Sequence, residues 1–261
     1  MEILCRFINW FGLLMLNVFS MLLDLFFPAG RSNIYKIHGK RFNFRPGTMD
    51  RLIAWEVWNF HSYDIGKYQI RENDVVVDIG AQIGTFTVYA AGLAQRGKVL
   101  AIEPLEESFR LLENNVKLNG LNNVKLLNLA VVGEEADSKV RLYIDPINTG
   151  GHSIYGKGKG VFVPTLTLSA LIKQGKLSTI DFLKIDAEGA EMEIVLKTEK
   201  SVLRKIKHIA MEYHEYFNQK ANHQDLMRYL ESCGFRVWVK KTLFSTYVQK
   251  TGLIFAEIER G

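Results

Sequence analysis

Residues 74–86, DVVVDIGAQIGTF, constrain the fold of this chain more than any other stretch. The three consecutive valines are apolar and β-branched, which is typical of a strand buried on both faces of a parallel sheet. Asp78 ends this run, Gly80 and Gly84 follow at a D-x-G-x-x-x-G spacing, and a helical pattern begins at Thr85. A strand, a glycine turn and a helix N-terminus predict a site where the backbone approaches a nucleotide.

The type of nucleotide is narrowed by what the glycine loop lacks and by the next strand. The loop has neither the G-x-G-x-x-G of a dinucleotide site nor the Gly-Lys-Ser/Thr of a phosphate loop. Residues 98–104, KVLAIEP, predict a second buried strand that ends at Glu103. This acid follows the glycine loop by about 20 residues, the distance at which a carboxylate reaches a ribose diol. An adenosine is implied, and the glycine loop disfavours a dinucleotide.

Composition sets broad limits on the class of protein. The 261 residues suffice for one α/β domain with a substantial core. The net charge of +5 permits an anionic partner without demanding one. Cys5 and Cys233 show neither a pairing pattern nor metal-ligand spacing, which favours a reducing compartment.

Residues 1–27 are strongly apolar, and their few polar side chains recur on one stripe of a predicted helix. Three interpretations stay open: a helix in a membrane interface, a transmembrane anchor over residues 10–27, and a helix packed on the domain or on a second copy in a homodimer. Basic residues follow closely, so a spanning helix would leave the catalytic part in the cytoplasm. We therefore expect a cytoplasmic protein, either free or held on the inner face of a membrane.

Strands and helices alternate along the rest of the chain. Residues 32–45 predict a hairpin turning at Gly39, and Thr48 or Asp50 is expected to cap a helix that ends before Gly66. Helices are predicted at 106–118, 169–175, 192–203 and 223–232, and strands at 123–129, 139–144, 161–163, 180–185, 208–212, 235–239 and 253–257. Residues 130–131 are expected to continue into a loop, and the glycine-rich residues 148–160 to form a lid or a connector.

This alternation predicts an α/β fold with an open, mostly parallel sheet. We divide the chain into an apolar helix at 1–30, a hairpin and helix at 31–71, and a nucleotide-binding domain at 72–261. Ligands of such sheets bind beyond the carboxyl ends of the strands. One crevice is therefore expected to collect Asp78, Glu103, Asp186, Glu212 and His214.

Several spaced motifs carry a resemblance to a known family. In order, DIGAQIGTF, AIEP, NLAVVG, DFLKIDAEGAE and MEYHE resemble the FkbM family of S-adenosylmethionine-dependent methyltransferases, and FRPGTMD before the first strand also fits. The resemblance spans roughly residues 42–257. It implies the class I methyltransferase fold, a Rossmann-like seven-stranded sheet with helices on both faces and its last strand antiparallel. It also implies methylation of hydroxyl oxygens of sugars, polyketides and related small molecules.

The resemblance also assigns residues position by position. Asp78, Gly80, Ala81 and Gly84 would hold the methionine end of the cofactor, Glu103 its ribose, and Asn128 and Ala130 would lie near the adenine. Gln82, Thr85 and Pro104 complete the expected cofactor contacts, although Gln82 stands where the family more often has Asn. Lys184, Asp186, Glu188, Glu212 and His214 would line the place where the methyl donor and the acceptor meet.

Methylation of a neutral hydroxyl removes its proton, so a base is useful. His214 is the best single candidate because its ordinary pKa lies near neutrality. Asp186 or Glu188 would serve if burial raised its pKa, and Lys184 would steady the alkoxide or pair with an acid. Two alternatives remain: a structural ion-pair network, and a divalent cation on Asp186, Glu212 and His214, which we rank below a site without metal.

The sequence thus predicts an S-adenosylmethionine-dependent O-methyltransferase acting on a sugar, glycan, lipid-linked or other small hydroxylated acceptor. The alternatives are metal-assisted O-methylation and a membrane-attached nucleotide-binding module without catalysis. A nicotinamide oxidoreductase conflicts with the glycine spacing. A nucleic-acid substrate is not expected, because the chain has no Asn-Pro-Pro-Tyr-like tetrapeptide and no basic tract interleaved with aromatic residues.

Overall fold

The computed structural model describes residues 34–63, 68–134, 138–144, 151–155, 158–215, 222–240 and 251–259. The apolar helix predicted at residues 1–27 lies outside the described residues, as do residues 148–150 and 156–157 of the glycine-rich stretch. Within the described part of the chain, no helix has both the length and the apolar character needed to cross a membrane.

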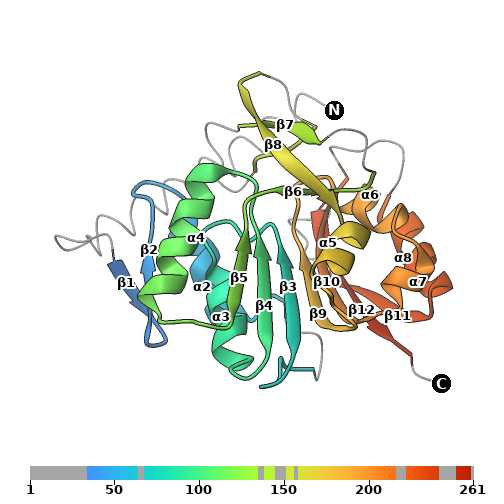
Figure 1. Cartoon of the computed structure of the whole chain (residues 1–261), viewed down its shortest axis with the longest axis horizontal. Coiled ribbons are helices and arrows are strands. Elements are labelled where there is room, and N and C mark those ends of the chain that lie inside the picture. The colour runs from blue at the N-terminus through green and yellow to red at the C-terminus, as the bar shows by residue number, and fades with distance from the viewer. Residues whose placement is uncertain are drawn as a thin grey trace.

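A seven-stranded sheet forms the centre of the molecule (Figure 1). Its strands, in spatial order, are β11 (Phe235–Lys240), β12 (Thr251–Ile258), β10 (Ile206–His214), β9 (Ile180–Ile185), β3 (Val75–Ile79), β4 (Lys98–Ile102) and β5 (Val124–Leu127). β12 pairs antiparallel with both of its neighbours, whereas β10, β9, β3, β4 and β5 pair in parallel. This order and the single reversed strand confirm the expected class I methyltransferase fold.

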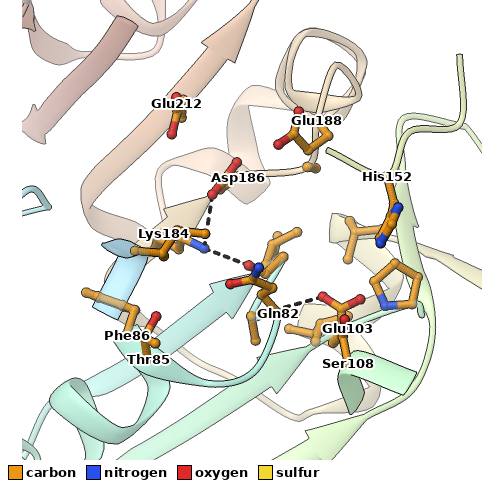
Figure 2. A pocket seen from close by; sticks show the side chains of 18 of the residues that line it. Gln82, Thr85, Phe86, Glu103, Ser108, His152, Lys184, Asp186, Glu188 and Glu212 are labelled. Atoms are coloured by element: carbon orange, nitrogen blue, oxygen red, sulfur yellow. Dashed lines mark hydrogen bonds and ion pairs between the residues drawn. The ribbon is translucent and has the colours of Figure 1, made fainter. Parts of the chain in front are cut away.

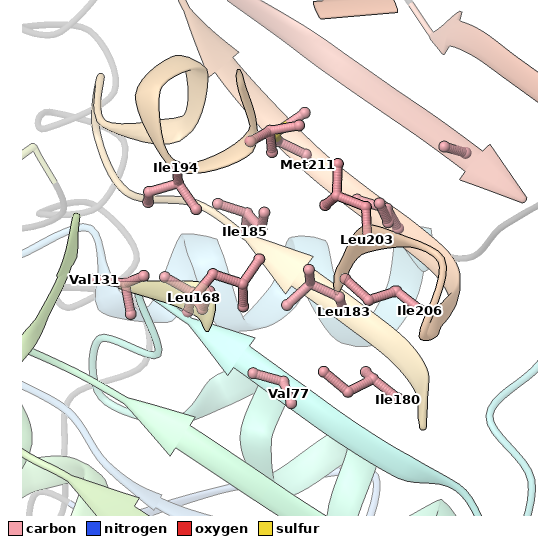
Figure 3. Packing of buried hydrophobic residues seen from close by; sticks show 14 of the residues in the cluster. Val77, Val131, Leu168, Ile180, Leu183, Ile185, Ile194, Leu203, Ile206 and Met211 are labelled. Atoms are coloured by element: carbon pink, nitrogen blue, oxygen red, sulfur yellow. The ribbon is translucent and has the colours of Figure 1, made fainter. Parts of the chain in front are cut away.

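Helices cover both faces of the sheet because successive strand residues point to opposite sides. On β3, Val76 packs in a cluster with α2 and α3, whereas Val77 packs in a cluster with α5, α6 and α8. Figure 3 shows the second cluster, in which Ile185 of β9 lies near Leu168 and Ile194. The helices are α2 (Asp50–Phe60), α3 (Thr85–Leu93), α4 (Glu106–Leu118), α5 (Leu168–Gln174), α6 (Glu191–Leu196), α7 (Lys200–Leu203) and α8 (His223–Ser232).

The hairpin predicted at residues 32–45 is confirmed by β1 (Ile34–Ile37) and β2 (Lys40–Asn43). It is fixed to α4 by side-chain amides, since Asn115 and Asn119 accept hydrogen bonds from the backbone of Asn43 and Arg41. The predicted helix is present, but its N-cap is neither of the two predicted residues. Met49 is the N-cap of α2, and the Asp50 carboxylate instead accepts hydrogen bonds from the backbone and the guanidinium of Arg45.

Two local predictions were wrong. Residues 130–131, expected in a loop, belong to β6 (Ala130–Val132), which pairs in parallel with β8 (Gly160–Thr167). β8 also pairs antiparallel with β7 (Lys139–Tyr143), so the insertion builds a second, three-stranded sheet. The helix predicted at 192–203 is two helices, α6 and α7. The first helix ends at Leu196, and the Thr198 hydroxyl donates a hydrogen bond to the Ile194 carbonyl at this end.

Candidate active site

A cavity of about 330 Å³ opens at the carboxyl ends of β3, β4, β9 and β10 (Figure 2). Its volume falls in the range of small-molecule sites. Eleven of the fifteen residues assigned from the sequence line it: Gly80, Ala81, Gln82, Thr85, Glu103, Pro104, Ala130, Lys184, Asp186, Glu188 and Glu212. The predicted crevice is therefore present, and it draws on strands that are far apart in the sequence.

The other four assigned residues stand behind this wall. Asp78 is fully buried and accepts a 2.6 Å hydrogen bond from the Thr87 hydroxyl. Gly84 is the left-handed N-cap of α3. Asn128 donates to the carbonyls of Glu103 and Pro104 rather than facing the cavity. These three residues shape the wall from behind, and His214, which lies deeper still, is described below.

Lys184 ties the glycine loop to the strand next to it. Its ammonium donates a 2.7 Å hydrogen bond to the Gly80 carbonyl and lies 3.2 Å from Asp78 and 3.7 Å from Asp186. Burial alone lowers the pKa of Lys184, but Asp78 and Asp186 outweigh this effect and raise it. The lysine is therefore charged and engaged, which agrees with the predicted pairing to an acid.

Gly80 is required by a close approach between two chain segments. A Cβ atom at this position would lie 1.7 Å from the carbonyl oxygen of Asp186, and the residue has φ +75°. Both conditions call for glycine. The D-x-G part of the loop motif thus places the ends of β3 and β9 in contact at the floor of the cavity.

Glu103 holds the opposite side of the cavity floor. One carboxylate oxygen accepts the N–H of Gln82 and the other the N–H of Leu105, each at 2.9 Å. Burial raises the pKa of Glu103 to about 7, and the two N–H bonds only partly offset this effect. Each oxygen keeps one lone-pair site, so the carboxylate can still accept from a pair of hydroxyl groups.

Gln82 carries an unused donor at this site. Its amide nitrogen Nε2 is buried and has no hydrogen-bond partner among the described residues. The residue has φ +51°, a left-handed conformation that non-glycine residues rarely adopt. A buried amide without a partner and a strained backbone at the wall of a cavity indicate a ligand contact.

The far end of the cavity is acidic. Asp186 and Glu188 follow β9, Glu212 belongs to β10, and Glu56 reaches the same wall from α2. Figure 2 shows Asp186, Glu188 and Glu212 around this end, opposite Glu103. Burial raises the pKa of Glu188 to about 8 and that of Glu212 to about 7. These carboxyl groups exchange protons close to neutral pH.

His214 lies behind the acidic end and is only 4 % exposed. Its Nδ1 is 3.0 Å from Glu191, and its Nε2 is 3.5 Å from Glu188 and 3.7 Å from Glu212. Burial alone lowers the pKa of His214, but Glu188 and Glu191 raise it well above its ordinary value. The ordinary pKa that favoured His214 as the base is therefore not kept in the folded protein, and the imidazole does not line the cavity.

The FkbM methyltransferase domain matches residues 78–237, which is more than half of the chain. The chain belongs to the FkbM methyltransferase family. The matched region contains the cavity wall from the glycine loop to Glu212, and it makes this protein a methyltransferase.

Known relatives of this FkbM methyltransferase agree with that assignment. It is 28 % identical over 196 residues to methyltransferase sdnD of Sordaria araneosa, covering 62 % of this chain and 74 % of the relative. It is also 28 % identical over 148 residues to hexuronic acid methyltransferase AglP of Haloferax volcanii, covering 56 % of this chain and 58 % of AglP. The crystal structure of an FkbM methyltransferase from Methylobacillus flagellatus is similar with a TM-score of 0.52 and 16 % identity, over 77 % of this chain and 47 % of that one.

The cation site suggested by the sequence has a different composition in this FkbM methyltransferase. Among the described residues, Asp186, Glu191 and His214 have potential ligand atoms within 4.8 Å of one another, so Glu191 replaces Glu212 in the predicted set. Glu191 already accepts N–H bonds from Ala187 and Gly189. Both carboxylate oxygens of Glu191 are thus engaged by the backbone, and metal-assisted methylation stays a prediction.

Several cavity residues were not found from the sequence. α2 and the segment after it contribute Met49, Ile53, Glu56 and Tyr63, and the insertion contributes His152 and Ile154. Tyr63 donates a 3.3 Å hydrogen bond to Asp186, and the Ser153 hydroxyl donates to the carbonyl of Glu188. Two sequence signals lay near them: the FRPGTMD motif, which contains Met49, and the lid or connector expected at 148–160, which contains His152 and Ile154. Neither named these side chains, since their contacts depend on how α2 and the insertion fold over the sheet.

Proposed function

We propose that this FkbM methyltransferase transfers the methyl group of S-adenosylmethionine to a hydroxyl oxygen of a sugar, glycan or other small hydroxylated molecule. The observation that carries the proposal is that one cavity contains a ribose-type acceptor, Glu103, at one end and carboxyl groups with raised pKa values at the other. The relative named as a hexuronic acid methyltransferase supports a sugar acceptor.

The residues at the Glu103 end fit an adenosine cofactor. Glu103 would accept the ribose hydroxyls, and the buried, unpartnered amide of Gln82 would donate to the ligand. Gly80 and Ala81, whose N–H groups are held by the Ile102 carbonyl, leave the loop without bulky side chains at the cavity floor. When bound, the cofactor supplies an electrophilic methyl group on a sulfonium.

The acidic end would handle the acceptor and its proton. As the oxygen–methyl bond forms, the hydroxyl proton passes to a carboxylate, and we assign this base to Glu188. Its pKa of about 8 meets the condition set from the sequence: the ionised fraction of Glu188 acts as the base, and this fraction grows as pH rises toward that value. His214, held by Glu191, would position the Glu188 carboxylate. The main contribution of the cavity is alignment of the two reactants.

Calorimetric titration with S-adenosylhomocysteine tests the cofactor assignment. We expect binding that weakens at least tenfold in Glu103→Gln, since a neutral amide accepts ribose hydroxyls less strongly than a carboxylate. Glu134→Gln removes an exposed carboxylate of the surface pair with Lys197 and serves as the control, with unchanged affinity expected. Absence of binding to the wild-type protein at millimolar ligand would rule the proposal out.

Membrane contact through residues 1–27, a homodimer and a cytoplasmic location stay predictions, because they concern residues or partners outside the described structure. Deleting residues 1–30 and comparing vesicle flotation of both proteins tests the first. We expect the full chain to float with vesicles and the shortened chain to stay in the soluble fraction. Equal partition of the two proteins contradicts membrane contact through this segment.

A further inference from the structure

The acceptor end of the cavity has an unusual balance of charge. Glu56, Asp186, Glu188 and Glu212 come from α2, β10 and the loop after β9, and all four line the same cavity. Lys184 is the one lysine or arginine that lines it within the described part of the chain. Four carboxyl groups thus share a small volume with one lysine in the cavity wall, and Lys240, which does not line the cavity, is a further cation whose charge acts on Glu56.

The cations near this end already have closer partners. Lys184 lies 3.2 Å from Asp78, which stands behind the wall, and 3.7 Å from Asp186. His214 lies 3.0 Å from the fully buried Glu191, and farther from Glu188 and Glu212. Asp78 therefore has the strongest electrostatic effect on Lys184, and His214 is shared between Glu188 and Glu191. Among the carboxyl groups that face the cavity, Glu56 and Glu212 thus have the least positive charge beside them.

The uncharged partners at this end do not change that balance. Tyr63 donates a hydrogen bond to Asp186, and the Ser62 hydroxyl donates to Glu56. One oxygen of Glu188, Oε2, is buried and makes no hydrogen bond among the described residues, although the imidazole of His214 is nearby. This oxygen has only the 3.5 Å contact with Nε2 of His214, so at the wall of an existing cavity it can still accept a hydrogen bond from a ligand.

The raised pKa values of the carboxyl groups at the acceptor end agree with an excess of negative charge there. Burial raises the pKa of Glu56, Glu188 and Glu212, and Asp186 raises all three further. Carboxyl groups that cannot find enough positive charge hold protons instead. A cationic ligand would replace those protons, whereas an anionic ligand would meet like charges at short range.

We propose that the acceptor end selects its substrate by charge. It takes a hydroxylated acceptor that carries an ammonium group beside the reacting hydroxyl, accepts a neutral one less well, and rejects one that carries a carboxylate or phosphate there. Glu56 and Glu212 are the specificity-determining residues, because they face the cavity and are weakly paired: Glu212 lies 3.7 Å from His214, which is closer to Glu188 and Glu191, and Glu56 accepts a hydrogen bond from the neutral Ser62 hydroxyl. This inference rests on the proposed hydroxyl methylation, and it separates this chain from a hexuronic acid methyltransferase.

Three matched sugars test the inference on the protein saturated with S-adenosylhomocysteine. The probes are a methyl glucoside and two derivatives changed at C6, a 6-amino-6-deoxyglucoside (called here the glucosaminide) and a glucuronide, so that a hydroxyl, an ammonium and a carboxylate occupy the same position. Saturation-transfer NMR measures their affinities. We expect the glucosaminide to bind at least about tenfold more tightly than the glucuronide, with the glucoside between them. Calorimetry in two buffers should show proton release with the glucosaminide alone.

Charge-neutralising variants show whether the named residues set the preference. Glu212→Gln and Glu56→Gln should each narrow the difference between glucosaminide and glucuronide by about threefold or more, and Glu134→Gln on the surface should leave it unchanged. Retained affinity for S-adenosylhomocysteine shows that each variant is folded. Equal affinity of the charged probes, preference for the glucuronide, or no binding of any probe at tens of millimolar overturns the inference.

The proposed function is judged separately in the same preparation. Binding of S-adenosylhomocysteine without a charge preference overturns the inference and leaves the methyltransferase cofactor assignment in place. Failure of S-adenosylhomocysteine itself to bind overturns the proposed function before any sugar is added.

Discussion

The carbonyl oxygen of Gly80 accepts a hydrogen bond of 2.7 Å from Nζ of Lys184. This contact joins the loop after β3 to β9, and the same ammonium also faces the buried Asp78. The lysine therefore fixes the glycine loop, which lines the cofactor end, relative to the acidic residues of the acceptor end. Its loss is expected to affect both stability and ligand binding.

Lys184→Met should lower the free energy of unfolding by about 3 to 5 kcal/mol, because it leaves Asp78 as a buried charge without its partner. S-adenosylhomocysteine affinity should fall with it, since the glycine loop loses an anchor. Urea denaturation and calorimetry measure the two effects. Lys197→Met, which breaks the exposed pair with Glu134, is the control and should not move the urea midpoint.

Gly80→Ala should destabilise the protein by about 3 kcal/mol or more, because the added Cβ meets the Asp186 carbonyl. Gly120→Ala separates this clash from backbone strain. Gly120 also has a positive φ, +61°, but a Cβ there meets nothing within 4 Å. We expect the control to cost only about 1 to 2 kcal/mol. Equal midpoints of the two variants in thermal unfolding would contradict the close approach.

Stability should fall as pH rises between 4.5 and about 7 because of Glu103. The pKa of its carboxyl group rises from 4.5 to about 7 on folding, so in this window the native state binds more protons than the unfolded state. The contribution is on the order of 3 kcal/mol over the window. Glu103→Gln removes this titrating group. The free energies of unfolding of the wild type and the variant, measured with urea at a series of pH values, should therefore differ by an amount that changes with pH only between 4.5 and about 7.

Cofactor binding should release protons near neutral pH. Ribose hydroxyls donate to a carboxylate and favour its ionised form, so S-adenosylhomocysteine should lower the pKa of Glu103 from about 7. Calorimetry at pH 7 in buffers of different ionisation enthalpy measures the number of protons released. We expect about half a proton in the wild type and none from this group in Glu103→Gln. An identical release in both proteins would place the ribose elsewhere.

Glu191→Gln should cost about 3 kcal/mol, since it removes the closest carboxylate from the buried imidazolium of His214. The pKa of His214 is raised on folding, so this ion pair stabilises the protein fully below the ordinary histidine pKa and loses its effect as pH rises through the higher folded value. NMR titration of the ring should show a lower pKa in the variant. Glu257→Gln, beside His208, should leave the His214 titration unchanged.

Much of the fold was predictable because it depends on local patterns. The valine run before Asp78 and the strand before Glu103 are apolar stretches of strand length with clear ends, and both are confirmed. β6 was missed because Ala130–Val132 is only three residues long and gains its hydrogen bonds from β8, some thirty residues later in the chain. The break between α6 and α7 was missed because the apolar pattern continues through it.

The sequence by itself determined which chemical groups reach the carboxyl edge of the sheet, since strand ends, glycine spacing and acid positions are local features. Only the tertiary structure decided their roles. It placed Asp78, Asn128 and His214 behind the cavity wall and brought Glu56 and Tyr63 of the α2 region to its surface. It also surrounded His214 with Glu188, Glu191 and Glu212, which raise its pKa and remove the condition that favoured it as the base. Proton affinity depends on burial and on neighbours distant in the chain, and neither is written in a local motif.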